Sequence, residues 1–167
     1  MTSQEYEYLI SGMVKSFYEL VEGIENADVK SNIPKKKGQK AKINRIEGIS
    51  NYKHQIDISV HAPKALILIE CKKWSREVEV GHFLTFLGRI LDIEQKYSGQ
   101  FEVHGSIVTV KGFQKGVCTL AHHHQKVGLI IATSFDDVAI KFSERYSRFL
   151  KLQAVGLEWQ PQPVPRS

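Results

Sequence analysis

Three residues in the middle of the chain have types suited to phosphoester chemistry: Asp57, Glu70 and Lys72. Glu70 and Lys72 stand two residues apart in a strand-like segment, so their side chains leave the same face. Glu70 directly follows an apolar run, where an unpaired carboxylate is costly and a hard cation such as Mg²⁺ or Mn²⁺ relieves the cost. A metal ion held by Asp57 and Glu70 can activate water, and Lys72 can position that water, help to deprotonate it or stabilise developing negative charge.

The same residues also fit a purely structural role. Asp57, across the strands, or Glu70, on the same strand, can form a salt bridge with Lys72, a common arrangement that contributes little to stability. The spacing alone leaves both interpretations open. In the metal-binding interpretation, the main-chain carbonyl of Cys71, between Glu70 and Lys72, is a further candidate oxygen ligand.

Two adjacent strands are expected to position these residues. Apolar and polar side chains alternate in residues 54–60, which predicts a strand with one covered face. Residues 61–64 indicate a turn, and residues 65–72 form the nearly unbroken apolar run of a strand covered on both faces. The short turn makes the strands antiparallel and can bring Asp57 beside Glu70, subject to a register that the sequence does not determine.

The remaining elements follow from hydrophobic periodicity and turn residues. Helices are predicted at residues 5–25, 78–96 and 114–125, with a last helix from Ser134 or Asp136 to about Leu152, and further strands at residues 105–110 and 127–132. The packed face predicted for the second helix consists of Val80, Phe83, Leu84, Leu87, Ile90 and Leu91. Strands alternating with helices favour parallel pairing and right-handed crossovers. We therefore expect an α/β fold, a three-layer α/β/α sandwich with a central mixed sheet.

Positive charge is concentrated in one segment. Residues 30–53 contain eight lysines and arginines against one acid, Glu47, whereas the whole chain has a net charge of +5. Such a segment can release counterions from a phosphate backbone, or it can be a solvated loop without a specific role. We expect a long loop or irregular ribbon at residues 30–53, inserted before the two strands of a single domain at residues 1–157. A proline-rich flexible tail is expected at residues 158–167.

Composition excludes several other classes of protein. The two cysteines, Cys71 and Cys118, form neither a disulfide framework nor a zinc-finger pattern. No apolar stretch approaches the ~20 residues of a membrane helix, and the first ten residues contain acids where a signal peptide would be basic. We therefore expect a cytoplasmic protein without a membrane partner.

The motif around the candidate site resembles a known family. The segments His54-Gln55-Ile56-Asp57 and Ile69-Glu70-Cys71-Lys72-Lys73-Trp74 resemble the core of the PD-(D/E)XK nuclease superfamily, and most closely the Mrr-like restriction endonucleases. The likeness covers roughly residues 54–132. Ile56 stands where the motif name has proline, a frequent departure in the superfamily.

The resemblance implies a role for each matching residue. Asp57 and Glu70 match the metal-binding acids, and Lys72 matches the catalytic lysine. Many members also have a metal-binding glutamate on the first helix; Glu7 matches that placement best, with Glu19 as the rival. Gln55, which should share the face of Asp57, is a candidate contact for the substrate or the attacking water.

The implied activity is metal-dependent hydrolysis of DNA phosphodiester bonds, with Mg²⁺ or Mn²⁺. Two alternatives are a DNA-binding module on the same scaffold that cuts only with a partner or not at all, and a structure-specific, junction-resolving nuclease. Helix-turn-helix and finger patterns are absent, so specificity is low or comes from loops, a dimer or a partner. Because duplex cleavage needs two cuts, a homodimer is expected. The residues expected to contact DNA are Lys35, Lys36, Lys37, Lys40, Lys42, Arg45, Lys53 and Lys73.

Overall fold

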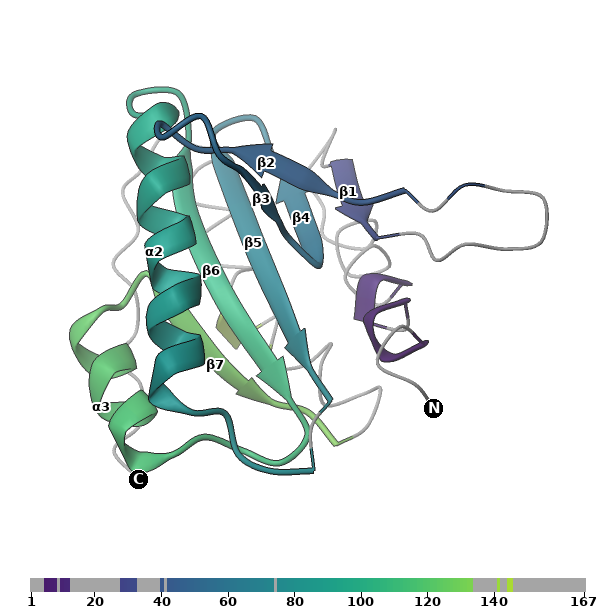
Figure 1. The fold of residues 1–167 in the computed structure, drawn as a ribbon, viewed down its shortest axis with the longest axis vertical. Helices are drawn as coiled ribbons and strands as arrows, with labels where there is room; N and C mark the ends of the chain where they lie inside the picture. The colour runs from purple at the N-terminus through teal and green to yellow at the C-terminus, as the bar shows by residue number, and fades with distance from the viewer. Residues whose placement is uncertain are drawn as a thin grey trace.

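A five-stranded mixed sheet forms the centre of the molecule (Figure 1). The structure, a computed structural model, describes residues 5–8, 10–12, 28–32, 40, 42–73, 75–133, 141, 144 and 145. In sheet order, the strands are β1 (Asp28–Ser31), β4 (Ile58–His61), β5 (Ala65–Lys72), β6 (Glu102–Thr109) and β7 (Val127–Ile131). Neighbours β1, β4 and β5 are antiparallel, whereas β5, β6 and β7 are parallel. The predicted mixed sheet is confirmed.

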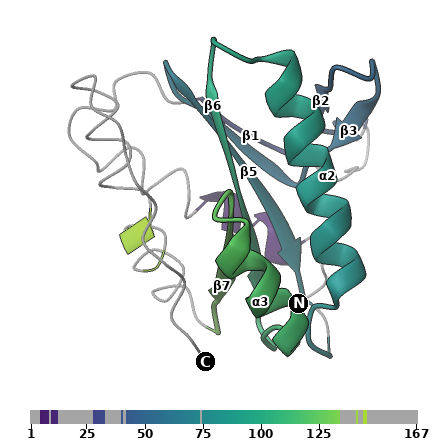
Figure 2. The ribbon, with the colours of Figure 1, turned by 90° about the vertical axis from the view of Figure 1, so that its left-hand side faces the viewer.

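Helices lie on both sides of this sheet. The helices α2 (Val80–Lys96) and α3 (Lys115–His123) cover one face. Figure 2 shows the described residues of the last predicted helix on the other side, where Arg145 lies against Gly128 of β7. The predicted α/β sandwich is therefore confirmed: α2 and α3 cover one face of the sheet, and the described residues of the last predicted helix lie on the other.

The predicted strand at residues 54–60 is wrong, because the chain changes sheets within it. Its first residues belong to β3 (Lys53–Gln55), which pairs with β2 (Arg45–Glu47) in a separate two-stranded ribbon. The chain then bends at Ile56 and Asp57 before it enters β4. Ile56 is fully buried, and its N–H donates to the Asn44 carbonyl. Alternation of apolar and polar residues is the same on both sides of such a bend, so periodicity does not reveal it.

The basic segment at residues 30–53 contains more regular structure than predicted. Lys30 and Ser31 belong to β1, an edge strand of the main sheet, and residues 45–47 form β2. The prediction of a long loop or irregular ribbon is wrong for Lys30 and Ser31, which pair with β4 of the main sheet, whereas residues 45–47 form a short two-stranded ribbon with residues 53–55. The elements predicted at residues 65–72, 78–96, 105–110, 114–125 and 127–132 are present, with ends shifted by at most three residues.

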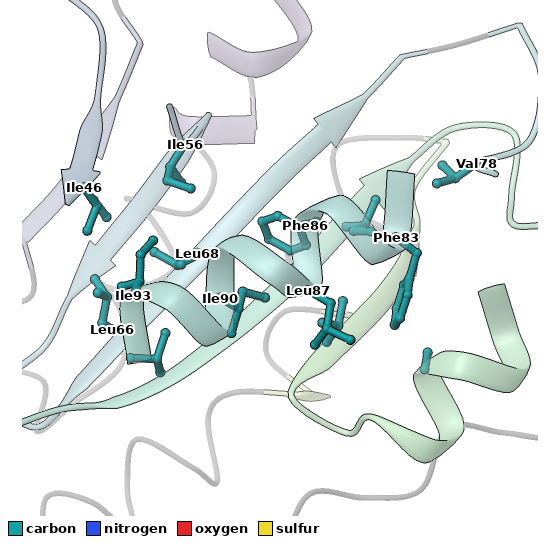
Figure 3. Close-up of a cluster of buried hydrophobic side chains, with 14 of the residues drawn as sticks. Ile46, Ile56, Leu66, Leu68, Val78, Phe83, Phe86, Leu87, Ile90 and Ile93 are labelled. Carbon is teal, nitrogen blue, oxygen red and sulfur yellow. The ribbon is translucent and has the colours of Figure 1, made fainter. Parts of the chain in front are cut away.

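The main hydrophobic core lies between α2 and the sheet (Figure 3). The buried residues of α2 are Phe83, Phe86, Leu87, Ile90 and Ile93. Leu84 and Leu91, predicted on the packed face, are 48% and 46% exposed. The buried residues of α2 recur at spacings of three and four residues from Phe83 to Ile93. Leu84 and Leu91 lie outside this stripe, so they are exposed although they are equally apolar.

Gly105 of β6 allows α2 to pack closely against the sheet. A Cβ atom at this position would lie 2.2 Å from Ile90 Cδ1 and 2.9 Å from Phe86 Cε1. Because protein interiors are close-packed, the distance between α2 and β6 at Gly105 determines how far the side chains of α2 extend over β5.

Several predictions fall outside the described residues: helix residues 13–25, Glu19, Lys35 to Lys37, and the tail at residues 158–167. Of the last predicted helix, only Lys141, Glu144 and Arg145 are described, and these three are helical. In the described part of the chain, no helix has the length and apolar character needed to span a membrane.

Candidate active site

Asp57 is positioned by the bend between β3 and β4. Its main-chain carbonyl accepts a hydrogen bond from the Asn32 N–H at 3.2 Å, which continues the pairing of β1 with β4. Its side-chain Oδ2 accepts from the Cys71 N–H at 2.8 Å. The last β4–β5 pair is Ile58 with Ile69, so Asp57 comes next to Glu70. The Asp57 carboxylate thus stands where the strand ladder ends, beside the candidate residues of β5.

Glu70 forms ion pairs with two cations. Its Oε1 lies 2.7 Å from Lys72 Nζ, and its Oε2 lies 3.3 Å from Arg89 Nη1 on α2. The carboxylate is buried, so both contacts offset the cost of removing its charge from water. The structure therefore contains the Glu70–Lys72 salt bridge that the spacing allowed.

Asp57 lacks an equivalent cationic partner among the described residues. Burial, and then repulsion from Glu70, raise the pKa of Asp57 to about 7, against the lowering effect of the Cys71 N–H. A pair of mutually repelling carboxylates in a buried setting attracts either a proton or a cation. Asp57, Glu70 and Lys72 are thus brought together.

Glu7 lies near the same group. Burial raises the pKa of Glu7 most, and a hydrogen bond from the Asn32 side chain lowers it; weaker effects come from Glu70, which raises it, and Lys72, which lowers it. The glutamate that matched the family pattern best is therefore within electrostatic reach of both β5 residues. The rival, Glu19, lies outside the described residues.

Cys71 contributes its main chain to the site rather than its thiol. Its N–H is taken by Asp57, and its side chain is buried. Burial, followed by the nearby carboxylates of Asp57, Glu7 and Glu70, raises the pKa of the Cys71 thiol. Because a thiol binds metal as the thiolate, the main-chain carbonyl remains the candidate ligand.

The donor set suits a hard divalent cation. No three His, Cys, Asp or Glu side chains form a metal-binding group in the part of the chain that the structure describes. Mg²⁺ commonly uses only one or two protein carboxylates, together with waters and phosphate oxygens. Asp57 has one oxygen, Oδ1, without a hydrogen bond to a described residue, and it repels Glu70. The two acids therefore fit Mg²⁺ or Mn²⁺.

Gln55 is not on the predicted face. It belongs to β3, and its side chain is exposed, whereas Ser59 is fully buried in β4 and bonded to Asn44 and His61. The expectation that Gln55 shares the face of Asp57 is wrong because of the bend. Gln55 still adjoins the site through its carbonyl, which lies 3.4 Å from Arg89 Nη1.

Arg89 is the residue that sequence reasoning missed. It lies three residues after Phe86 and four before Ile93, within the apolar stripe of α2, and its side chain is 31% exposed. A charged residue at such a position must meet a polar partner on the facing element. That signal was present in the sequence, but the partner, Glu70, is on a strand that only the packing identifies.

The β2–β3 ribbon carries part of the predicted DNA-binding set. Arg45 pairs with Gln55 and Glu47 with Lys53, so their side chains share the outer face, opposite the buried Ile46. Figure 1 shows the ribbon on the α2 side of the sheet, above β4 and β5. Lys40, Lys42, Arg45 and Lys53 are exposed, Lys73 is half-buried, and Lys35 to Lys37 are not described.

Asp92 of α2 anchors the turn of this ribbon. Its carboxylate lies 2.6 Å from His54 Nε2 and accepts hydrogen bonds from the Ser50 hydroxyl at 2.7 Å and the Ser50 N–H at 3.1 Å. The His54 contact, followed by the Ser50 hydroxyl, lowers the pKa of Asp92. Gly48 is required at the turn because a Cβ would lie 1.7 Å from Asp92 Oδ2.

Comparison with solved structures supports the fold. The crystal structure of AF1548, a protein of unknown function, has a TM-score of 0.54 and 18% identity, covering 84% of this chain and 68% of that one. VC1899 from Vibrio cholerae has a TM-score of 0.59 and 15% identity, covering 89% of this chain and 34% of that one. This chain thus spans about a third of VC1899.

A repair endonuclease from Pyrococcus abyssi has a TM-score of 0.41 and 13% identity, covering 72% of this chain and 45% of that one. A likeness at this level carries no argument about function. No protein-family model and no curated protein sequence matches the chain. The comparisons therefore show the fold alone.

Proposed function

We propose that the chain is a divalent-metal-dependent DNA endonuclease with Asp57, Glu70 and Lys72 as its centre. The observation that carries the proposal is the buried Asp57 carboxylate, which stands beside Glu70 while Glu70 contacts Lys72 at 2.7 Å. Glu70 is paired with Lys72 and Arg89, but Asp57 has no such partner among the described residues, so its buried charge is costly unless it takes up a proton or binds a metal ion. This arrangement suits phosphodiester hydrolysis, which needs a cation, an activated water and stabilisation of negative charge.

Mg²⁺ or Mn²⁺ would be held by Asp57 and Glu70, with the Cys71 carbonyl and Glu7 as further ligands. When bound, the metal ion would supply an activated water and neutralise charge on the scissile phosphate. Asp57 must lose its proton to act as a ligand. Lys72 would leave Glu70 Oε1 and donate to the attacking water or to a phosphate oxygen.

The exposed outer face of the ribbon would hold the DNA backbone. Arg45 and Lys53 lie on this face, and Gln55 lies opposite Arg45. Arg89 contacts the Gln55 carbonyl and Glu70, so the ribbon directly adjoins the proposed centre. Phosphates bound along this face would therefore approach the two acids.

Plasmid nicking tests the proposal. The parent protein should convert supercoiled plasmid to open circles with Mg²⁺, and Lys72→Ala should slow the reaction by roughly 100-fold or more. Lys64→Ala is the matched control, since Lys64 is an exposed lysine just before β5, at the opposite end of that strand. Linear, single-stranded and four-way DNA are compared in parallel, and a strong preference for junctions would identify a structure-specific nuclease.

A protein that binds a divalent metal ion but leaves all these DNA forms intact would contradict the proposal. The double ion pairing of Glu70 favours one second candidate, a DNA-binding module that does not cut alone. A Glu70→Ala variant separates the two. For a nuclease it binds DNA but loses the cleavage that the parent shows, whereas for a module the parent and the variant bind alike and neither cuts.

A further inference from the structure

Arg89 connects the candidate active site with the ribbon. Its Nη1 lies 3.3 Å from Glu70 Oε2 and 3.4 Å from the Gln55 carbonyl. These acceptors belong to different sheets, Glu70 to the main sheet and Gln55 to the ribbon. One side chain of α2 thus contacts the proposed metal-binding acid and the neighbouring proposed DNA-binding element.

The position of Arg89 is determined by packing. Its neighbours on the same stripe, Phe86, Ile90 and Ile93, are almost completely buried, and the close approach at Gly105 holds α2 against β6. An arginine on such a helix has little freedom to move its backbone. Its Nη1 lies between the Gln55 carbonyl and Glu70 Oε2 and can therefore hold the Glu70 carboxylate in one orientation.

Lys72 and Arg89 use different oxygens of Glu70. Lys72 contacts Oε1, whereas Arg89 contacts Oε2. A metal ion that binds Glu70 must displace one cation or share its oxygen. Lys72 is the one proposed to act on water or phosphate, so its departure would free Oε1, while Arg89 remains bound to Oε2 and to the Gln55 carbonyl.

We infer that Arg89 is a positioning residue that holds Glu70 through Oε2, so that Oε1 is presented to the metal ion. This inference rests on the proposed function, because it assigns Glu70 as a metal ligand. Groups that orient metal ligands commonly change metal affinity by 10- to 100-fold when they are removed.

The charge of Arg89 and its proposed role in orienting Glu70 predict opposite changes in metal affinity when Arg89 is removed. A nearby positive charge opposes the binding of a divalent cation, so removal of the guanidinium should tighten binding if charge alone matters. If Arg89 orients Glu70, its removal should weaken binding despite the more favourable charge. A role limited to helix packing would lower thermal stability and leave metal affinity unchanged.

The experiment is titration of the DNA-free protein with Mn²⁺, with free Mn²⁺ measured by electron paramagnetic resonance. We expect Arg89→Met to weaken Mn²⁺ binding roughly tenfold. Arg89→Lys should fall between Arg89→Met and the parent, because an ammonium group can still pair with Glu70 Oε2 but differs from the guanidinium in length and shape. Lys126→Met is the matched control. It removes one positive charge from an ion pair with Glu94, just before the start of β7 and at the opposite end of the sheet from Lys72.

Equal or tighter Mn²⁺ binding by Arg89→Met would overturn the inference while leaving the proposed metal site intact. If circular dichroism shows that Arg89→Met does not fold, the test rests on Arg89→Lys alone. A Mn²⁺ affinity of Arg89→Lys equal to that of the parent would then overturn the inference. Asp57→Asn serves as the reference for a damaged site. A parent protein that binds no Mn²⁺ would overturn the metal site of the proposed function, and the inference with it.

Discussion

At the scale of single residues, the charge of Asp57 opposes folding, because burial and repulsion from Glu70 both disfavour it. Glu70 is neutralised by Lys72 and Arg89, whereas Asp57 is buried beside Glu70 with only the Cys71 N–H donating to its carboxylate among the described residues. A site that is strained without its ligand is a common feature of functional centres. The effect of the Asp57 charge on the free energy of unfolding can be measured on the metal-free protein.

We predict that Asp57→Asn stabilises the metal-free protein at pH 8 by about 1 kcal/mol or more. Asparagine keeps the hydrogen-bond acceptor for Cys71 N–H and removes the charge that repels Glu70. The measurement is urea unfolding of both proteins in a chelating buffer. An Asp57→Asn protein that is less stable than the parent at pH 8 would contradict the repulsion described here.

The pH dependence of that difference has a defined sign. The pKa of Asp57 rises from 3.8 to about 7 on folding, so between these values the folded chain holds a proton that the unfolded chain has lost. The stability of the parent must therefore decrease as pH rises from about 4 to 7, and be constant with respect to this group above that window. The advantage of Asp57→Asn should shrink as pH is lowered toward 4.

At the scale of elements, the ribbon is held in place by interactions outside itself. A two-stranded ribbon is marginally stable alone. Asp92 anchors its turn, Ile46 enters the core, and Arg89 contacts its end at Gln55. These contacts fix the position of the ribbon, whose outer face carries Arg45 and Lys53.

We predict that the double substitution Arg45→Met and Lys53→Met lowers the salt dependence of DNA binding. Each phosphate contact contributes a slope of about −0.9 to the plot of log K against log salt concentration, so the slope should decrease in magnitude by about 2. Fluorescence anisotropy with a short duplex measures it. The control is the double substitution Lys64→Met and Lys126→Met, which removes the same charge elsewhere. Equal slopes for both double variants would assign no phosphate contact to the ribbon.

At the scale of the whole molecule, the distance between α2 and the sheet determines whether the site exists. Arg89 reaches Glu70 because α2 packs directly over β5 and β6 (Figure 3). The glycine at position 105 makes that distance possible. Helix packing and site geometry are therefore linked.

We predict that Gly105→Ala destabilises the protein by roughly 1–3 kcal/mol, because its Cβ would overlap Ile90 and Phe86. Gly88→Ala is the matched control on α2. No atom lies within 4 Å of a Cβ at Gly88, which is exposed, so the change should stabilise the helix by about 0.5–1 kcal/mol. Urea unfolding of both variants tests the pair. A neutral Gly105→Ala would show that α2 can move away from the sheet at no cost.

The local sequence was enough to predict which side chains share a face of β5 and that β5 is buried. Period two places Glu70 and Lys72 on one face of a strand, and the apolar run before them places that strand in the interior. The parallel strand–helix order predicted the mixed sheet. The concentration of basic residues predicted where positive charge lies, though not that its first residues would belong to β1 of the main sheet.

The groups that surround Glu70 depend on tertiary packing and do not follow from the local sequence. Asp57 reaches it through a bend that leaves the alternation of residues 54–60 unchanged, and Arg89 reaches it from a helix that begins eight residues after β5 ends. The periodicity of apolar side chains indicates which face of a helix or strand is buried. Pairing register and helix docking decide what covers it, because they depend on the packing of residues far apart in the chain.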